Sequence, residues 1–69
     1  MNNTYRLLKD DMDFFLAALS QVRVSVWHVQ EDGQHIIDYG GPVEAFSTVF
    51  IKIMGKRYFR NTFEFRTQK

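Results

Sequence analysis

Cysteine is absent from this 69-residue sequence, and proline occurs only once. Without cysteine the chain can form no disulfide, thiolate zinc site or redox centre, which argues against a secreted disulfide scaffold and favours a cytoplasmic location. No apolar run approaches the roughly 20 residues that a membrane-spanning helix needs, and charged residues interrupt the N-terminal segment where a signal peptide would be apolar. We therefore expect a soluble, cytoplasmic protein with no membrane contact.

A large excess of charge of one sign is absent as well. Nine Lys and Arg residues face eight Asp and Glu residues, and 45% of the chain is hydrophobic. This balance excludes a disordered chain and a non-specific polycation. A domain of this size buries only about 60% of the surface that its unfolded chain exposes, so small domains often gain stability from a partner subunit. The sequence predicts a single folded domain over residues 1–69, which self-association would stabilise.

Catalytic and cofactor motifs are also missing. No serine lies in a nucleophile-elbow context, and Gly40–Gly41 is followed by Pro42, which removes an amide donor that a phosphate-binding loop would use. His28 and His35 would share one face of a hairpin as diagonal neighbours, but no third metal ligand accompanies them. We predict a non-enzymatic protein with no cofactor and no metal ion.

The N-terminal segment has the periodicity of a helix. Residues 4–19 are rich in helix formers, and Asn3 or Thr4 can cap the first turn. Apolar residues recur at spacings of three and four, which places them on one stripe: Tyr5, Leu8, Met12, Phe15 and Leu19. The pattern predicts a helix whose apolar stripe packs on another element.

The next segment has the period of two that is typical of strands. Polar and apolar residues alternate from Val22 to Gln30, and Asp32–Gly33 is a favoured two-residue hairpin turn before a return strand over residues 35–39. In this register the pairs across the hairpin are Val26 with Tyr39, Trp27 with Asp38, His28 with Ile37, and Gln30 with His35.

The second half of the chain, after Gly40–Pro42, contains an ambiguous segment. Residues 43–54 fit a helical stripe and a strand pattern, and the β-branched content favours strand, with a short helix over residues 43–47 as the alternative. A turn at Met54–Gly55 would make a second hairpin. Its register pairs Phe50 with Phe59 and Phe46 with Phe63.

Together these elements predict an α+β fold in which an N-terminal helix packs on a small antiparallel sheet of two β-hairpins, in the order helix-β-β-β-β. The expected core consists of Leu8, Met12, Phe15, Leu19, Val24, Val26, Ile37, Phe46, Phe50, Phe59 and Phe63.

One helix can cover only one face of such a sheet, so the opposite face would remain apolar. On that face the sequence predicts an interface formed by Trp27, Val29 and Ile36 with Asp38 as a polar rim residue. The alternative is that Trp27 packs under the helix and that the face of Val22, Val24 and Val26 is exposed. A second copy of the chain is the expected cover, and the acidic helix is a further contact surface for an unidentified protein. The predicted function is therefore that of a homodimeric protein-interaction or regulatory protein.

The alternative prediction rests on an uneven distribution of charge. Residues 1–49 contain three basic and seven acidic residues, a balance of −4, whereas residues 50–69 contain six basic residues and one acid, a balance of +5. Basic residues between aromatic ones are typical of single-stranded nucleic-acid binding. The candidate contacts in the C-terminal hairpin are Lys52, Lys56, Arg57, Tyr58, Arg60 and Arg66.

Overall fold

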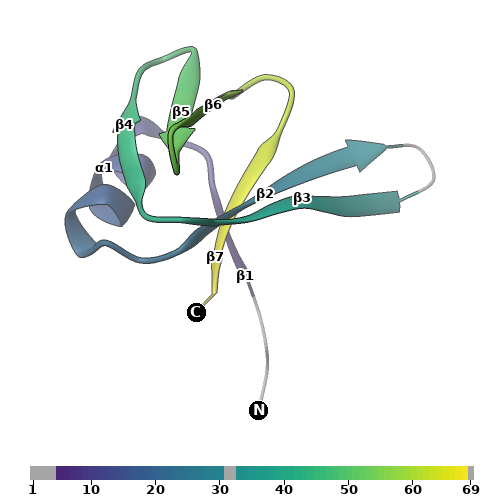
Figure 1. The fold of residues 1–69 in the computed structure, drawn as a ribbon, viewed down its shortest axis with the longest axis horizontal. Helices are drawn as coiled ribbons and strands as arrows, with labels where there is room; N and C mark the ends of the chain where they lie inside the picture. The colour runs from purple at the N-terminus through teal and green to yellow at the C-terminus, as the bar shows by residue number, and fades with distance from the viewer. Residues whose placement is uncertain (1–4, 31–32, 69) are drawn as a thin grey trace.

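The computed structural model describes residues 5–30 and 33–68, and within these it contains one helix and seven strands (Figure 1). In chain order the elements are β1 (Tyr5–Leu8), α1 (Asp11–Ser20), β2 (Val24–Gln30), β3 (Gly33–Gly41), β4 (Val43–Phe46), β5 (Phe50–Ile53), β6 (Lys56–Phe59) and β7 (Glu64–Gln68). The strands form two antiparallel sheets, in the orders β1-β7-β2-β3 and β4-β5-β6. The α+β class is confirmed, but the strands do not form the predicted single sheet of two hairpins.

The predicted helix over residues 4–19 is wrong in its first part, because Tyr5–Leu8 pairs with β7 as strand β1. The helix begins only after Asp10, which is the N-cap residue. Asp13 accepts hydrogen bonds from the backbone N–H groups of Lys9 at 3.0 Å and Asp10 at 3.1 Å, so donors at the helix start are satisfied. The predicted caps, Asn3 and Thr4, lie outside the described residues.

The predicted packing face of the helix is also wrong. Phe14 and Ala17 are buried, whereas the predicted core residues Met12, Phe15 and Leu19 are exposed. The stripe is periodic as expected, but α1 packs through the neighbouring face. There the small side chain of Ala17 lets the helix approach the sheet closely, and Phe14 fills the space beside it.

The β2–β3 hairpin has a different register from the predicted one. Trp27 pairs with Ile36, His28 with His35, and Val26 with Asp38. The shift arises because β3 already begins at Gly33, the partner of Gln30, and because bulges interrupt the ladder on either side of Val26.

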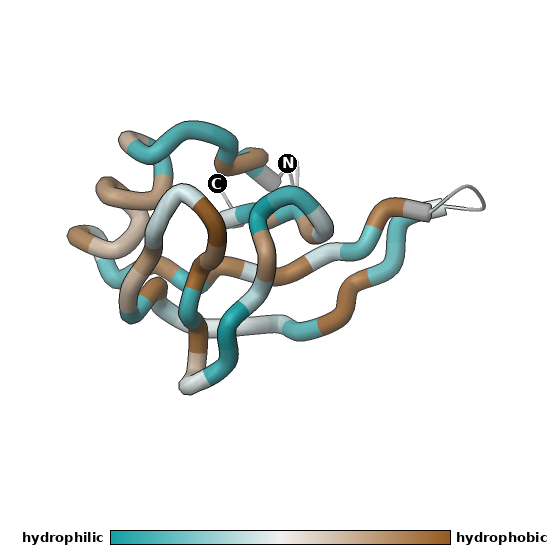
Figure 2. The backbone as a smooth tube through the Cα atoms, turned by 90° about the horizontal axis from the view of Figure 1, so that it is seen from above, coloured by the Kyte–Doolittle hydropathy of each residue, from teal (hydrophilic) through white to brown (hydrophobic). Residues whose placement is uncertain are grey.

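All four predicted pairs of this hairpin are therefore wrong, namely Val26 with Tyr39, Trp27 with Asp38, His28 with Ile37, and Gln30 with His35. Of the predicted turn residues, Gly33 belongs to β3 and Asp32 lies outside the described part of the chain. The two histidines face each other directly and are not diagonal neighbours. The hairpin projects from the body of the molecule (Figure 2).

A sharp bend at Gly40–Pro42 carries the chain directly from β3 in one sheet to β4 in the other (Figure 1). Gly40 has a φ of +73°, and a Cβ atom there would overlap the backbone carbonyl oxygen of Val24. Only glycine adopts this conformation and allows this contact without strain. The glycines predicted to separate two halves thus join the two sheets.

The β4-β5-β6 sheet agrees more closely with the sequence. Residues 43–46 and 50–53 are strands, which excludes the helical alternative, and β5 and β6 turn at Met54–Gly55 as predicted. The pair of Phe50 with Phe59 is confirmed. The predicted pair of Phe46 with Phe63 is wrong, because Phe46 pairs with Ile51.

The core lies between α1 and the two sheets. Phe65 of β7 occupies its centre and makes an edge-to-face contact with Phe14, with ring centroids 5.6 Å apart. The buried hydrophobic residues are Leu8, Phe14, Ala17, Val24, Val26, Val43, Ile51, Ile53, Tyr58 and Phe65.

Three of the predicted core residues, Leu8, Val24 and Val26, are confirmed, and Phe46 and Phe63 are partly buried against the core. The other predicted core residues do not lie in the core. Met12, Phe15 and Leu19 of the helix are exposed, as are Ile37 and Phe59, and Phe50 is only half-buried. Ile37 is displaced by the register shift of β3. Phe50 and Phe59 lie on the outer face of their sheet, because their neighbours Ile51 and Tyr58 face inward.

Candidate protein-interaction surface

The outward face of α1 is an apolar stripe. Its members are Met12, Phe15, Leu16 and Leu19, and their exposed fractions are 62%, 51%, 45% and 70%. Spacings of three and four place all of them on one side of the helix. No charged residue follows Asp13 within α1, so the stripe is uninterrupted over the last two turns.

The α1 stripe continues into Val22, which follows the helix and is 40% exposed. Five apolar side chains with these exposed fractions make a patch on the order of a few hundred Å². The largest apolar patch on a soluble monomer is typically about 300–600 Å² and is often functional. The stripe therefore has the size of an interaction surface.

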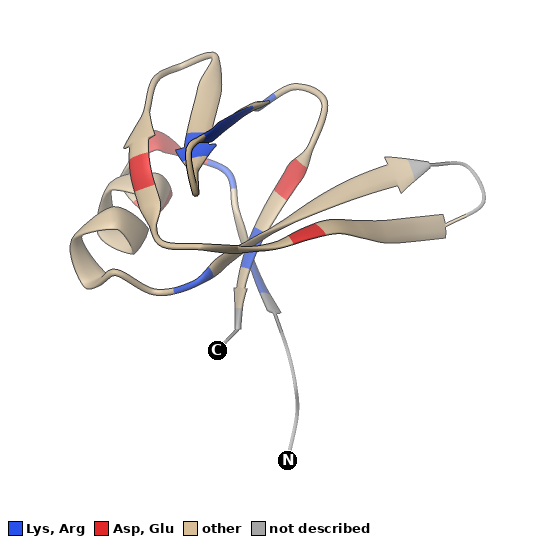
Figure 3. Cartoon of the chain, viewed as in Figure 1, with Lys and Arg blue, Asp and Glu red and all other residues tan. Residues whose placement is uncertain are grey.

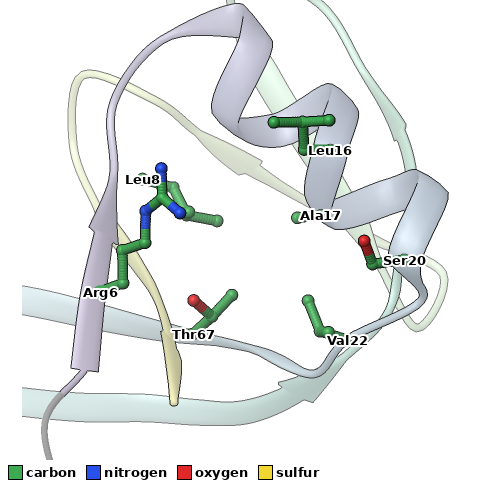
Figure 4. Close-up of a pocket in the computed structure, with 7 residues that line it drawn as sticks. All are labelled: Arg6, Leu8, Leu16, Ala17, Ser20, Val22 and Thr67. Carbon is green, nitrogen blue, oxygen red and sulfur yellow. The ribbon is translucent and has the colours of Figure 1, made fainter. Parts of the chain in front are cut away.

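A cleft of about 400 Å³ lies beside the stripe (Figure 4). It opens between β1, α1 and the end of β7, and it is lined by Arg6, Leu8, Leu16, Ala17, Ser20, Val22 and Thr67. Most of the lining is aliphatic, while one guanidinium and two hydroxyl groups supply the polar atoms. The cleft extends the apolar surface inward from the helix and is large enough to accept a bulky side chain.

The first turn of α1 is acidic, and two of its carboxylates have partners. Asp13 lies 3.4 Å from Arg6, and Asp11 lies 2.6 Å from Arg60. The hydrogen bond from the backbone N–H of Lys9 lowers the pKa of Asp13 most, and the hydrogen bond from the N–H of Asp10 lowers it further. The charged end of the helix is thus fixed by the fold, and the apolar stripe begins within this first turn, at Met12.

The predicted Trp27 interface is assembled only in part. Trp27 and Ile36 are cross-strand partners, and Val29 lies on the same face of β2. This face is partly covered, because the guanidinium of Arg66 lies 4.4 Å from the centre of the Trp27 ring. Trp27 also donates its Nε1–H to Ser25 Oγ at 2.8 Å.

Asp38, the fourth member of the predicted interface, lies on the opposite face as the partner of Val26. Its carboxylate accepts hydrogen bonds from the Tyr58 hydroxyl and from the Gly40 N–H, both at 2.7 Å. The Gly40 N–H, followed by the Tyr58 hydroxyl, lowers the pKa of Asp38. Burial, and then the bond to Asp38, raises the pKa of Tyr58 to about 12. This pair connects β3 to β6 and is structural.

The six residues of the predicted nucleic-acid surface do not form one patch. Tyr58 is buried, and Arg66 lies over Trp27 on the other sheet. Arg60 is held by Asp11, by two backbone carbonyl groups and by a cation–π contact with the ring of Phe14 at 4.7 Å.

Lys52, Lys56 and Arg57 remain together on β5 and β6 (Figure 3). Lys52 and Arg57 are direct cross-strand partners. Arg57 also lies over the ring of Phe50, 5.2 Å from its centre.

The sequence reasoning missed the outward orientation of the α1 stripe, although a signal was present. Residues 14–19 are Phe-Phe-Leu-Ala-Ala-Leu, which is apolar all around the helix. A helix that packs on only one side cannot bury such a segment completely. An exposed apolar face was therefore to be expected on α1 itself.

No family model, curated protein or solved structure matches this chain. Among the residues that the structure describes, no group of three or more His, Asp or Glu side chains is arranged to hold a metal ion. Within the same ranges, no helix is long and apolar enough to cross a membrane.

Proposed function

We propose that this chain is a non-enzymatic protein-interaction protein that forms a homodimer through the outward face of α1. The observation that carries the proposal is the exposed stripe of Met12, Phe15, Leu16 and Leu19. Four large apolar side chains on one face of a short helix are unfavourable in water, and covering them supplies the driving force for association.

The size of the patch supports a second copy as the cover. Two copies that each bury a few hundred Å² would form an interface below about 1,200 Å², which is the size of weak or transient protein interfaces, so the dimer should form in a concentration-dependent way. Homodimer interfaces are mostly isologous, so one self-complementary patch on each copy is sufficient.

The distribution of charge favours an antiparallel pairing of the two helices. If a two-fold axis passes between Phe15 and Leu16, Met12 of one copy lies beside Leu19 of the other. The acidic first turn of each helix then approaches the C-terminal end of its partner, which is followed by the exposed residue Arg23. Opposite helix dipoles and opposite charges would meet at both ends of this interface.

The α1 stripe is a better candidate than the Trp27 face, because Arg66 already covers part of Trp27. A role without catalysis fits the carboxylates of Asp13 and Asp38, which are occupied by structural hydrogen bonds. We also propose a cytoplasmic location, which the absence of cysteine from this small domain supports.

The test is sedimentation of wild-type protein and the Leu19→Arg variant over a range of concentrations. Leu19 is 70% exposed, so the variant should keep its circular dichroism spectrum. Both copies lose the contact, and removing two apolar side chains from an interface weakens it by about 3 kcal/mol or more, which corresponds to at least a hundredfold higher Kd.

Val49→Arg is the matched control, because it adds the same charge at a residue that is 57% exposed and distant in sequence from α1. This variant should remain dimeric. A wild-type protein that stays monomeric at all concentrations would refute the homodimer. Loss of the dimer in Trp27→Ala but not in Leu19→Arg would show that the strand face, and not α1, is the interface.

A further inference from the structure

The outer face of the β4-β5-β6 sheet carries an exposed aromatic ring beside unneutralised positive charge. Phe59 is 58% exposed, although it lies in a strand and pairs with Phe50. On the same face, two pairs further along the ladder, Lys52 lies directly opposite Arg57. Aromatic and basic side chains thus form adjacent rows on two neighbouring strands.

The opposed cations are not explained by the stability of the sheet. Like charges directly opposite each other on antiparallel strands are destabilising. Within the described ranges, no carboxylate forms an ion pair with Lys52, Lys56 or Arg57. The one acid of this sheet, Glu44, is occupied at the hairpin turn, where it accepts the N–H of Gly55 at 3.2 Å. Among the described residues, this face therefore has a net positive charge that an external anion would neutralise.

We propose that this face binds single-stranded nucleic acid. An unpaired base would stack on the exposed ring of Phe59, and the adjacent phosphates would contact Lys52 and Arg57. Base stacking on aromatic side chains together with basic residues along the backbone is the usual mode of sequence-tolerant single-strand binding. A base inside a duplex has no free face for this contact, so the surface distinguishes single strands from duplexes.

This activity is independent of dimerisation through α1, because the two surfaces share no residue. β6 is also an edge strand of its sheet. Charged residues on an edge strand prevent aggregation with other chains, which is an alternative explanation for them that needs no ligand. That alternative explains the charge of Arg57, but it does not explain an exposed phenylalanine on the same face, since Phe59 promotes the aggregation that the charge would prevent.

The experiment is fluorescence anisotropy with a labelled oligothymidylate of about twelve nucleotides, which is within the usual site size of such surfaces. Binding should weaken with salt, with a slope of log K against log[salt] of about −1.4 for the two phosphate contacts. Lys52→Gln and Arg57→Gln should each reduce this slope by about 0.7. Phe59→Leu, which keeps an apolar side chain but removes the ring, should weaken binding at least about fivefold.

Lys9→Gln is the matched control, because it removes one positive charge from an exposed side chain outside this face. It should change neither the affinity nor the slope. Failure to bind at about 50 mM salt, equal affinity for a duplex of the same length, or equal losses in Lys9→Gln and Lys52→Gln would each overturn the proposal. Unchanged binding in Phe59→Leu would also overturn it. Sedimentation of the same variants keeps this result separate from the dimer, which none of these substitutions should affect.

Discussion

The hydrogen bond between Tyr58 and Asp38 should make an unusually large contribution to stability at neutral pH. It connects β6 to β3 and therefore holds the two sheets together. The perturbation is Tyr58→Phe, which removes the hydroxyl group and keeps the ring packed edge-to-face on Phe63 at 5.6 Å. Hydrogen bonds to charged groups contribute about 1.5–3 kcal/mol, so the free energy of unfolding should fall by about this amount.

The pH dependence gives a second measure of the same bond. The pKa of Tyr58 is raised from about 10 to about 12 in the folded protein, so the folded state retains the phenolic proton more tightly than the unfolded state. The contribution of the protonated Tyr58 to the free energy of unfolding is complete below about pH 10 and is lost as the pH rises from about 10 to 12. A shift of two units corresponds to about 3 kcal/mol.

The pKa of Asp38 is lowered, so the sign is opposite at the acidic end. Its contribution is present above the unfolded pKa, near pH 4, and is lost as the pH falls through the folded value. The bond should therefore stabilise the fold most strongly between about pH 4 and pH 10.

Urea unfolding followed by circular dichroism, at one fixed protein concentration, measures these effects. The stability difference between wild type and Tyr58→Phe should be largest near neutral pH and should shrink above pH 10, because only wild type loses the bond there. A difference below about 0.5 kcal/mol at pH 7, or one that is equally large at pH 7 and at about pH 11.5, would refute the reasoning.

Four further substitutions test the fold. Gly40→Ala should destabilise the protein by more than about 3 kcal/mol in urea unfolding, because the new Cβ meets the Val24 carbonyl at a positive φ; a cost below about 1 kcal/mol would contradict the bend. Phe14→Ala should cost about 3–5 kcal/mol, whereas Phe15→Ala should cost less than about 1.5 kcal/mol, and equal costs would reverse the assignment of the helix faces. Asp13→Asn should lower the free energy of unfolding at neutral pH and should make it depend less on pH below about pH 4. The reason is that the pKa of Asp13 is lowered in the folded protein, so the stabilisation from its carboxylate is lost as the pH falls; an unchanged pH dependence in the variant would exclude this role.

The sequence was most informative where local signals and tertiary contacts agree. The alternating pattern of residues 50–59 and the Met54–Gly55 turn predicted β5, β6 and the pairing of Phe50 with Phe59 correctly. A two-residue turn fixes a short hairpin completely, so no distant part of the chain was needed for this prediction.

Long-range contacts decided the parts that were predicted wrongly. Residues 5–8 have helical propensity, but pairing with β7 makes them a strand, and β7 lies at the other end of the chain. The bulges beside Val26 follow from the simultaneous pairing of β2 with β3 and β7, which periodicity does not reveal. For the candidate sites, the sequence identified the relevant residue types but not which side of α1, β2 or β6 would face the core.

The position of β7 also determines when the protein can fold. It lies between β1 and β2, which do not pair with each other, so the four-stranded sheet cannot assemble until residues 64–68 are present. The pairing of Leu8 with Phe65 closes a loop that spans nearly the whole described chain, and such distant contacts slow folding. During synthesis the strands made first would wait with unpaired edges until β7 leaves the ribosome, and a nascent chain that stalls before that point would expose them to aggregation.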